Sequence, residues 1–284
     1  MTGIPFQKMQ GAGNDFVILD ARSGKLARKA FTAGVAKAIA DRRTGVGCDQ
    51  VILIERARDE GAAAMRIRNA DGGEVATCGN AARCVGLLLM NERGEDRVRL
   101  ETAGGLVEAV REGRDRVSVD MGAAKTDWQA IPLKEAADTL HLDLGEAALG
   151  EAVAVSMGNP HAVFFVEDAA KVALADAGPR LEHHPLFPER ANIGIAQMIA
   201  SDRLRLRVWE RGAGLTHACG SGACAAVVAA HRRGLVENEA EVVQDGGSLR
   251  VRLREDGHVL LSGPAAWSFT GELPAELIDQ ERAA

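Results

Sequence analysis

The sequence contains no tyrosine, and only 4% of its 284 residues are aromatic. Proteins that bind single-stranded nucleic acid stack the bases on aromatic side chains, and such side chains are scarce here. Positive charge is not in excess either, since 34 lysines and arginines face 40 aspartates and glutamates, a net charge of −6. This balance argues against binding to a nucleic-acid backbone. It leaves an anionic small molecule open as a partner, because such a substrate responds to local charge.

Long apolar segments are also absent from the sequence. No apolar run approaches the roughly 18 residues that a membrane-spanning helix needs. The N-terminal residues lack the apolar core of a signal peptide. The five cysteines, an odd number spread over the chain, do not resemble a secreted disulfide framework. We therefore expect a cytoplasmic protein with reduced thiols and no membrane partner.

The usual motifs of metal and cofactor sites are missing as well. The cysteines follow C-x5-C (78–84) and C-x4-C (219–224) spacings, not the C-x-x-C of zinc or thioredoxin-like sites. The segment Gly11-Ala12-Gly13-Asn14 lacks the Lys-Ser/Thr pair of a phosphate-binding loop. No lysine stands in a context typical of a Schiff base, although sequence alone leaves pyridoxal phosphate open. We expect neither a metal nor a cofactor, with a thiol-based metal or redox binder as the non-enzymatic alternative.

Several short segments alternate with period two, such as 203–209 and 250–254, which is typical of strands. Helical patterns are fewer, at about 26–40, 80–93, 134–141 and 221–233. The strands outnumber the helices and do not alternate with them regularly. This pattern predicts an α+β protein rather than a doubly wound parallel sheet.

The sequence contains an internal repeat. The segment 78–84, CGNAARC, resembles 219–224, CGSGAC, and the leading cysteines lie 219 − 78 = 141 residues apart. Each segment opens a predicted helix that closes on a basic residue and a glycine, Arg93-Gly94 and Arg233-Gly234, as helix C-termini often do.

Polar residues repeat at nearly the same offset. Asn69 and Glu210 each precede their cysteine by nine residues, while Gln50 and Asn192 precede it by 28 and 27. The pair Gly13-Asn14 has a counterpart in Gly158-Asn159. We therefore expect two related domains, 1–121 with Cys78 and 122–267 with Cys219.

The two Cys-Gly turns suit one class of reaction. A cysteine at a helix N-terminus lies near unbonded N–H groups and the positive end of the helix dipole, so we expect a lowered thiol pKa. Gly79 and Gly220 allow a ligand close to the backbone, where the same N–H groups bind a carboxylate. Two such turns would place Cys78 and Cys219 on opposite sides of the carbon next to that carboxylate. Inversion of a stereocentre needs this arrangement, a base on one face and an acid on the other.

The other repeated residues suit an amino-acid substrate. Asparagine and glutamine side chains offer donors and acceptors for its carboxylate and ammonium groups. Arg211 can hold a second carboxylate, and Glu210 can pair with an ammonium group. The three remaining cysteines, Cys48, Cys84 and Cys224, are interpreted as small buried hydrophobic residues.

A series of ordered motifs resembles the diaminopimelate epimerase family along nearly the whole chain. The motifs are GAGNDF (11–16), GVGCDQ (45–50), NADGGE (69–74), CGN (78–80), GNPH (158–161), ANIG (191–194), WERG (209–212) and ACGSG (218–222). The resemblance implies two mirror-related α+β domains, each a curled, mostly antiparallel sheet around a central helix, with the site in the cleft between them. It also implies that the last strand, about 268–284, rejoins the first domain.

The resemblance implies a cofactor-independent epimerase that interconverts LL- and meso-diaminopimelate in lysine and peptidoglycan precursor biosynthesis. It makes Cys78 and Cys219 the acid/base pair, with His161 and Glu210 tuning the thiol pKa values. The positions that match substrate-binding residues are Asn14, Gln50, Asn69, Gly79, Asn80, Asn159, Asn192, Glu210, Arg211, Gly220 and Ser221.

The family also implies a homodimer, to which Phe269 would contribute. The alternative is a two-cysteine enzyme of the proline racemase or hydroxyproline epimerase type. The pair Glu210-Arg211 argues against it, because a substrate with one amino-acid head needs no second ion-pairing site. His217 lies close to Cys219 in sequence, and we interpret it as an exposed loop residue.

Overall fold

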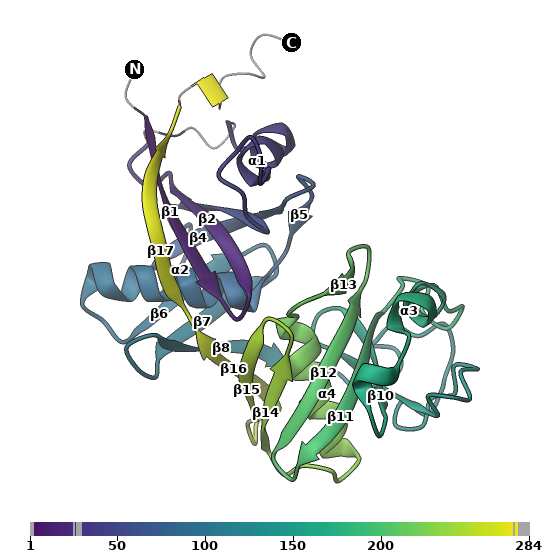
Figure 1. Cartoon of the computed structure of the whole chain (residues 1–284). Helices are drawn as coiled ribbons and strands as arrows, with labels where there is room; N and C mark the ends of the chain where they lie inside the picture. The colour runs from purple at the N-terminus through teal and green to yellow at the C-terminus, as the bar shows by residue number, and fades with distance from the viewer. Residues whose placement is uncertain (1–2, 25, 27–29, 275, 278–284) are drawn as a thin grey trace. The chain divides into compact units, whose positions relative to one another are not determined.

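The computed structural model describes residues 3–24, 26, 30–274 and 276–277 (Figure 1). The chain divides into two compact units. Unit 1 comprises Met1–Val119 with Gly263–Ala284, and unit 2 comprises Asp120–Ser262. Part of the segment 268–284, which we expected to rejoin the first domain, lies outside the described residues.

Unit 1 is built on strands β1–β8 and β17. Parallel pairing joins β2 to β3 and β4 to β6, and antiparallel pairing joins β17 to β1, β1 to β2, β3 to β4, β4 to β5, β6 to β7 and β7 to β8. The strands are β1 (Ile4–Gly11), β2 (Asn14–Asp20), β3 (Gln50–Glu55), β4 (Ala63–Asn69), β5 (Glu74–Val75), β6 (Arg97–Thr102), β7 (Gly105–Arg111), β8 (Arg116–Ala123) and β17 (Ala266–Leu273).

Unit 2 repeats this pattern strand for strand, with β9–β16 in the places of β1–β8. Parallel pairing joins β10 to β11 and β12 to β14, and antiparallel pairing joins β9 to β10, β11 to β12, β12 to β13, β14 to β15 and β15 to β16. The strands are β9 (Ala152–Ser156), β10 (Pro160–Phe165), β11 (Asn192–Ala200), β12 (Arg203–Glu210), β13 (Gly214–Thr216), β14 (Glu239–Gln244), β15 (Gly247–Leu253) and β16 (His258–Pro264). The two units are therefore pseudo-symmetric.

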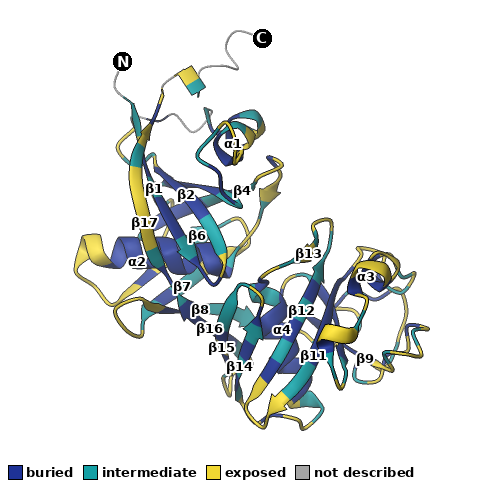
Figure 2. Ribbon diagram, viewed as in Figure 1, coloured by how far each residue is buried: buried dark blue, intermediate teal, exposed yellow. Residues whose placement is uncertain are grey.

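Each unit has a central helix that begins directly after its Cys-Gly turn. Helix α2 (Gly79–Arg93) packs against β1, β2, β6 and β7, and its residues 79–90 are all buried. Helix α4 (Gly220–Arg232) packs against strands β9–β12, β14 and β15 and is buried over 222–230 (Figure 2). A helix that is apolar on every side needs such an enclosure. The predicted α+β class, with a curled sheet around each central helix, is confirmed.

Both central helices are followed by glycine in the left-handed conformation, Gly94 with φ 68° and Gly234 with φ 69°. This conformation costs glycine little, because it has no Cβ. The predicted ends at Arg93-Gly94 and Arg233-Gly234 are therefore confirmed.

A second helix covers the outer side of the sheet in each unit. Helix α1 (Ala33–Ala40) packs on β3 and β4, and its N-cap Thr32 accepts a hydrogen bond from Val35 N–H at 3.2 Å. Residues 27–29 of the helix expected at 26–40 lie outside the described residues. Helix α3 (Leu174–Glu182) packs on β11, β12 and β13. Like α1, it connects the two strands of the first parallel pair.

The expectation for 134–141 was wrong. This segment is an irregular loop, with Lys134 N–H donating to Leu186 O at 2.9 Å. Among its apolar residues, Ala137 packs against the hydrophobic core that includes residues of α3. Helix α3 was not among the expected helices, and its interior contains Gly178-Pro179, a pair that usually interrupts a helix. The glycine is required there, since a Cβ at position 178 would lie 2.5 Å from the Trp209 ring.

Candidate functional site

The expected site residues of unit 1 gather where strands end and α2 begins. Gln50 opens β3 and Asn69 closes β4, and the two residues are direct partners in the antiparallel register. Their side chains meet, with Gln50 Nε2 donating to Asn69 Oδ1 at 2.9 Å. Asn14 opens β2, and its Oδ1 accepts a hydrogen bond from Asn80 Nδ2. The structure thus joins these amides in pairs.

Cys78 is the N-cap residue of α2, with extended backbone at φ −143° and ψ 113°. The first helical hydrogen bond runs from Ala82 N–H to Cys78 O at 2.9 Å. The preceding N–H groups, of residues 79–81, therefore lie outside the helical ladder at its positive end. Gly79 and Asn80 supply two of these donors beside the half-buried Cys78, as an anion site requires.

The expected residues of unit 2 occupy the equivalent places. Asn192 opens β11 and Glu210 closes β12. Asn192 Oδ1 accepts from Arg211 N–H at 3.0 Å, and its Nδ2 donates to Pro160 O at 2.9 Å. The asparagine therefore holds the backbone of Arg211 in place, and the Arg211 guanidinium donates to Glu189 O at 2.7 Å.

Asn159 and His161 flank the start of β10. His161 Nε2 lies 3.0 Å from Asn159 Oδ1, and Asn159 Nδ2 lies 3.5 Å from Ser221 Oγ. Burial lowers the pKa of His161 to about 3, and the nearby charge of Arg211 adds to this effect. The ring is therefore neutral at pH 7, and it donates its Nε2 proton because the amide oxygen can only accept.

Cys219 is the N-cap residue of α4, at φ −133° and ψ 112°. Its Sγ accepts from Gly222 N–H at 3.3 Å and lies 3.6 Å from Ser221 Oγ. Burial raises the pKa of Cys219 well above its ordinary value of 9.0, and the Glu210 carboxylate raises it further. The hydrogen bonds from Ser221 and Gly222 only partly offset this.

The lowered thiol pKa expected from the helix terminus is therefore wrong for Cys219 in this state. Cys219 is only 4% exposed. The cost of removing its thiolate from water therefore raises the pKa by more than the helix-end donors lower it. Burial also raises the pKa of Glu210, whose Oε1 accepts from Thr216 Oγ1 at 2.6 Å.

We call the expected site residues of each unit its half-site. Two further residues support the half-site of unit 2 around Cys219, and neither was expected from the sequence. Glu182, at the end of α3, accepts from Trp209 Nε1 at 2.8 Å and from Gly212 N–H at 3.0 Å. It thereby holds the chain on both sides of Glu210 and Arg211. Gln244, at the end of β14, accepts from Cys219 N–H at 2.8 Å. Gln244 is a polar residue buried at the end of an alternating strand, but no local signal marks Glu182.

The three remaining cysteines are all buried. Burial raises the pKa of Cys48 to about 11 and that of Cys84 to about 12, so both are thiols at pH 7. Cys224 is fully buried inside α4. His217 is exposed, as interpreted from the sequence. Over the described ranges, no group of three or more His, Cys, Asp or Glu side chains is arranged to hold a metal ion. None of the helices described is long and apolar enough to cross a membrane.

Comparison with known proteins adds independent evidence. A family model described as diaminopimelate epimerase matches residues 6–126 and 153–268. The chain is 58% identical to diaminopimelate epimerase of Acidiphilium cryptum over 275 residues, which cover 96% of this chain and 98% of the relative. It is 54% identical to that of Rhodospirillum centenum over 274 residues, covering 96% and 93%.

Solved structures share the fold at much lower identity. A hydroxyproline epimerase from Agrobacterium vitis, with bound trans-4-hydroxy-L-proline, matches with a TM-score of 0.67 and 18% identity. The match covers 95% of this chain and 92% of that protein.

Proposed function

Because the chain belongs to the diaminopimelate epimerase family, we propose that it inverts one α-carbon of diaminopimelate and so interconverts the LL and meso forms without a cofactor. The observation that carries this proposal is the duplicated Cys-Gly turn. Each unit presents a cysteine as the N-cap of its central helix, beside donors for a carboxylate. The reaction belongs to lysine and peptidoglycan precursor biosynthesis, and we place the enzyme in the cytoplasm.

The proposed reaction uses the two cysteines as an acid and a base. One cysteine, as the thiolate, removes the α-proton, and the thiol of the other delivers a proton to the opposite face. Cys78 and Cys219 exchange these roles when the reaction runs in reverse. Its raised pKa keeps Cys219 protonated before substrate binds. Glu210 supports this state because its charge disfavours the thiolate, and His161 contributes a neutral ring.

The N–H groups at the two helix ends bind the carboxylate next to the reacting carbon. They come from Gly79-Asn80 and Gly220-Ser221, and they stabilise the charge that builds there as the proton leaves. The amide side chains bind the amino-acid heads of the substrate, and Glu210-Arg211 accommodates the charged groups of the distal head. The amides are Asn14, Gln50, Asn69, Asn159 and Asn192.

We also propose that a second copy of the chain is the protein partner. Trp267 and Phe269 on β17 are 41% and 50% exposed, and large exposed apolar side chains often mark an interface. Light scattering should give twice the chain mass. Phe269→Ser should shift the equilibrium toward monomer, while Leu106→Ser, which removes a similarly exposed side chain on β7, should not.

Turnover of LL-diaminopimelate compared with L-proline tests the activity. In D2O, recovered substrate and product should carry deuterium at one α-carbon only. Absence of deuterium under active turnover would contradict proton transfer by the thiols. Racemisation of L-proline without diaminopimelate turnover would favour the alternative enzyme class.

A further inference from the structure

Three hydrogen bonds form a continuous chain through the half-site of unit 1. Arg83 Nη2 donates to Asn80 Oδ1 at 2.7 Å. Asn80 Nδ2 donates to Asn14 Oδ1, and Asn14 Nδ2 donates to Asp49 Oδ2 at 3.2 Å. Every bond in this chain points the same way, from a cation at one end to a carboxylate at the other.

The two ends fix the direction of the chain. An asparagine amide can rotate by half a turn, which exchanges its donor and its acceptor. A guanidinium can only donate, so Asn80 must turn its oxygen toward Arg83 and its nitrogen toward Asn14. A carboxylate can only accept, so Asn14 must turn its nitrogen toward Asp49. The orientation of both amides therefore follows from the chemistry of their charged neighbours.

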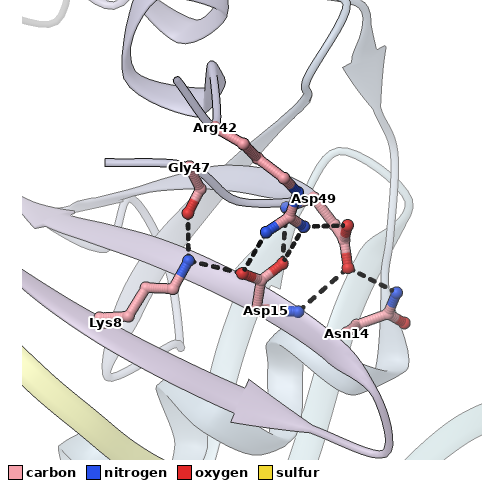
Figure 3. A network of polar contacts seen from close by, with 6 residues as sticks. All are labelled: Lys8, Asn14, Asp15, Arg42, Gly47 and Asp49. Carbon is pink, nitrogen blue, oxygen red and sulfur yellow. Dashed lines mark hydrogen bonds and ion pairs between the residues drawn. The ribbon is translucent and has the colours of Figure 1, made fainter. Parts of the chain in front are cut away.

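Both ends are firmly held. Arg83 is fully buried, and its Nε donates to Pro264 O at 3.3 Å. Asp49 accepts from Arg42 Nη2 at 2.8 Å and from Asp15 N–H at 3.1 Å (Figure 3). Arg42 donates to Oδ1, whereas Oδ2 accepts from both Asp15 N–H and Asn14 Nδ2.

Asp15 anchors this cluster in turn. It pairs with Lys8 at 2.6 Å and with Arg42 at 2.8 Å, and it accepts from Asp49 N–H at 2.9 Å. The cluster ties β1 and β2 to the loop before β3. These contacts join several charged groups rather than one exposed ion pair. Through Asn14, the network reaches Asn80, which lies beside Cys78.

We propose that Arg83 and Asp49 are positioning residues that set the polarity of the Asn80 and Asn14 amides, so that each amide keeps one N–H for a carboxylate of the substrate. Each Nδ2 carries two hydrogens, of which the chain uses one. Asn80 is the second residue of α2, and Asn14 is bonded to it. The inference rests on the proposed function for the identity of the substrate, but the orientation of the amides does not.

Asp49→Asn tests this proposal. In the variant, Arg42 must face the new amide oxygen, which turns its nitrogen toward Asn14 and toward the N–H of Asp15, where two donors then meet. We expect the KM for LL-diaminopimelate to rise about tenfold or more, with kcat changed by less than about threefold. Asp49→Glu keeps an acceptor-only group and should restore most of the affinity.

The matched control is Asp20→Asn at the other end of β2. Asp20 also accepts hydrogen bonds from an arginine, Arg22, at 3.0 and 2.6 Å, but it lies outside the chain. The KM of the Asp20→Asn variant for LL-diaminopimelate should equal that of the parent protein. An unchanged KM in folded Asp49→Asn would overturn the proposal, as would equal damage from Asp49→Glu, because the latter would indicate packing rather than polarity.

A second readout separates this inference from the proposed function. With selectively labelled asparagine, NMR should show slow exchange for the side-chain N–H groups of Asn14 and Asn80, and loss of that protection in Asp49→Asn. If the parent protein turned over no diaminopimelate while the protection behaved as expected, the function would fail and the polarity would stand. Fast exchange in the parent protein would overturn the polarity itself.

Discussion

Units 1 and 2 share their strand pairings and the placement of their helices, but they hold their site residues with different chemistry. In unit 1 the side-chain amides of Asn80 and Asn14 lie between the charged groups of Arg83 and Asp49. In unit 2 the corresponding chain starts at neutral His161, passes through Asn159 and Ser221, and reaches the sulfur of Cys219.

The difference shows which features of a duplicated fold persist and which change. The backbone pattern that places a cysteine at the start of a buried helix occurs twice. The surroundings of the two sulfurs do not match, because Cys219 is buried beside Glu210 whereas Cys78 is half-buried. Unequal environments suit a pair in which one member starts as the acid and the other as the base.

The largest effect should come from removing either sulfur. Cys78→Ala and Cys219→Ala should each lower epimerisation by about a thousandfold or more, because positioned acid–base groups contribute about 10²–10⁴-fold. Turnover should be measured in both directions. Cys224→Ala in the core of α4 is the control and should remain active. If only one of the two site variants lost activity, the functional equivalence of the halves would be disproved.

The two units should lose stability in different pH ranges. Burial, aided by Arg211, holds the pKa of His161 at about 3, so below pH 6.5 the unfolded chain binds a proton that folded unit 2 excludes. Stability of unit 2 should fall as the pH drops through this window, by at most about 3 kcal/mol down to about pH 4.

In unit 1 the corresponding loss occurs at lower pH. Burial alone would raise the pKa of Asp15, but hydrogen bonds from Arg42 and Lys8 outweigh it and place the pKa at about 2. Its contribution, roughly 1–2 kcal/mol, is present above pH 3.8 and is lost as the pH falls toward 2.

Urea unfolding followed by tryptophan fluorescence separates these two windows. Of the three tryptophans, Trp128 and Trp209 belong to unit 2 and Trp267 to unit 1, so Trp267→Phe leaves a signal from unit 2 alone. His161→Gln should flatten the slope of that signal between pH 6.5 and 4. An unchanged slope would show that the histidine is not buried and neutral.

A smaller effect should follow from Glu182→Gln in unit 2. The buried carboxylate accepts hydrogen bonds from Trp209 and Gly212, and charged hydrogen bonds of this kind contribute about 1.5–3 kcal/mol. We expect a loss of about 1–3 kcal/mol in the free energy of unfolding, together with a higher KM for diaminopimelate.

Glu146→Gln provides the matched control for this variant. It removes an ion pair with Arg180, which also lies on α3 but is 61% exposed. It should cost less than about 1 kcal/mol. If Glu146→Gln lowered the free energy of unfolding as much as Glu182→Gln, the buried carboxylate would have no special role in stability.

The smallest effect concerns the reactivity of the two thiols. At pH 8 iodoacetamide should modify Cys78 about tenfold faster than Cys219, whose thiolate is disfavoured by burial and by Glu210. Peptide mass spectrometry measures both rates in one sample. Glu210→Gln should speed the reaction of Cys219 by lowering its pKa. Faster modification of Cys219 in the parent protein would reverse the assignment of acid and base.

Much of the fold was predictable because its determinants are local and occur twice. The Cys-Gly turns, the apolar runs behind them and the closing glycines define α2 and α4 without knowledge of the rest. Helix α3 depends on contacts that the sequence does not reveal. Its Gly178-Pro179 pair looks like a break until the ring of Trp209 is seen against the glycine.

The site was predictable in its residue types but not in its electrostatics. The helix terminus indicated a lowered pKa for Cys219, whereas burial beside a carboxylate from another strand raises it. The role of Arg83 also depends on tertiary contacts. Its signal was nevertheless present, because an arginine inside an otherwise apolar helical run must find a partner when it is buried.

The pairing of β17 with β1 has a consequence for synthesis on the ribosome. Strand β17 follows all of unit 2 in the sequence, and Pro264, which accepts from Arg83, lies two residues before the first residue of this strand. The emerging chain can complete unit 2, including the surroundings of Cys219, while β1 is paired with β2 but still lacks its second neighbour, β17. The half-site around Cys78 is thus the first to be translated and the last to be assembled.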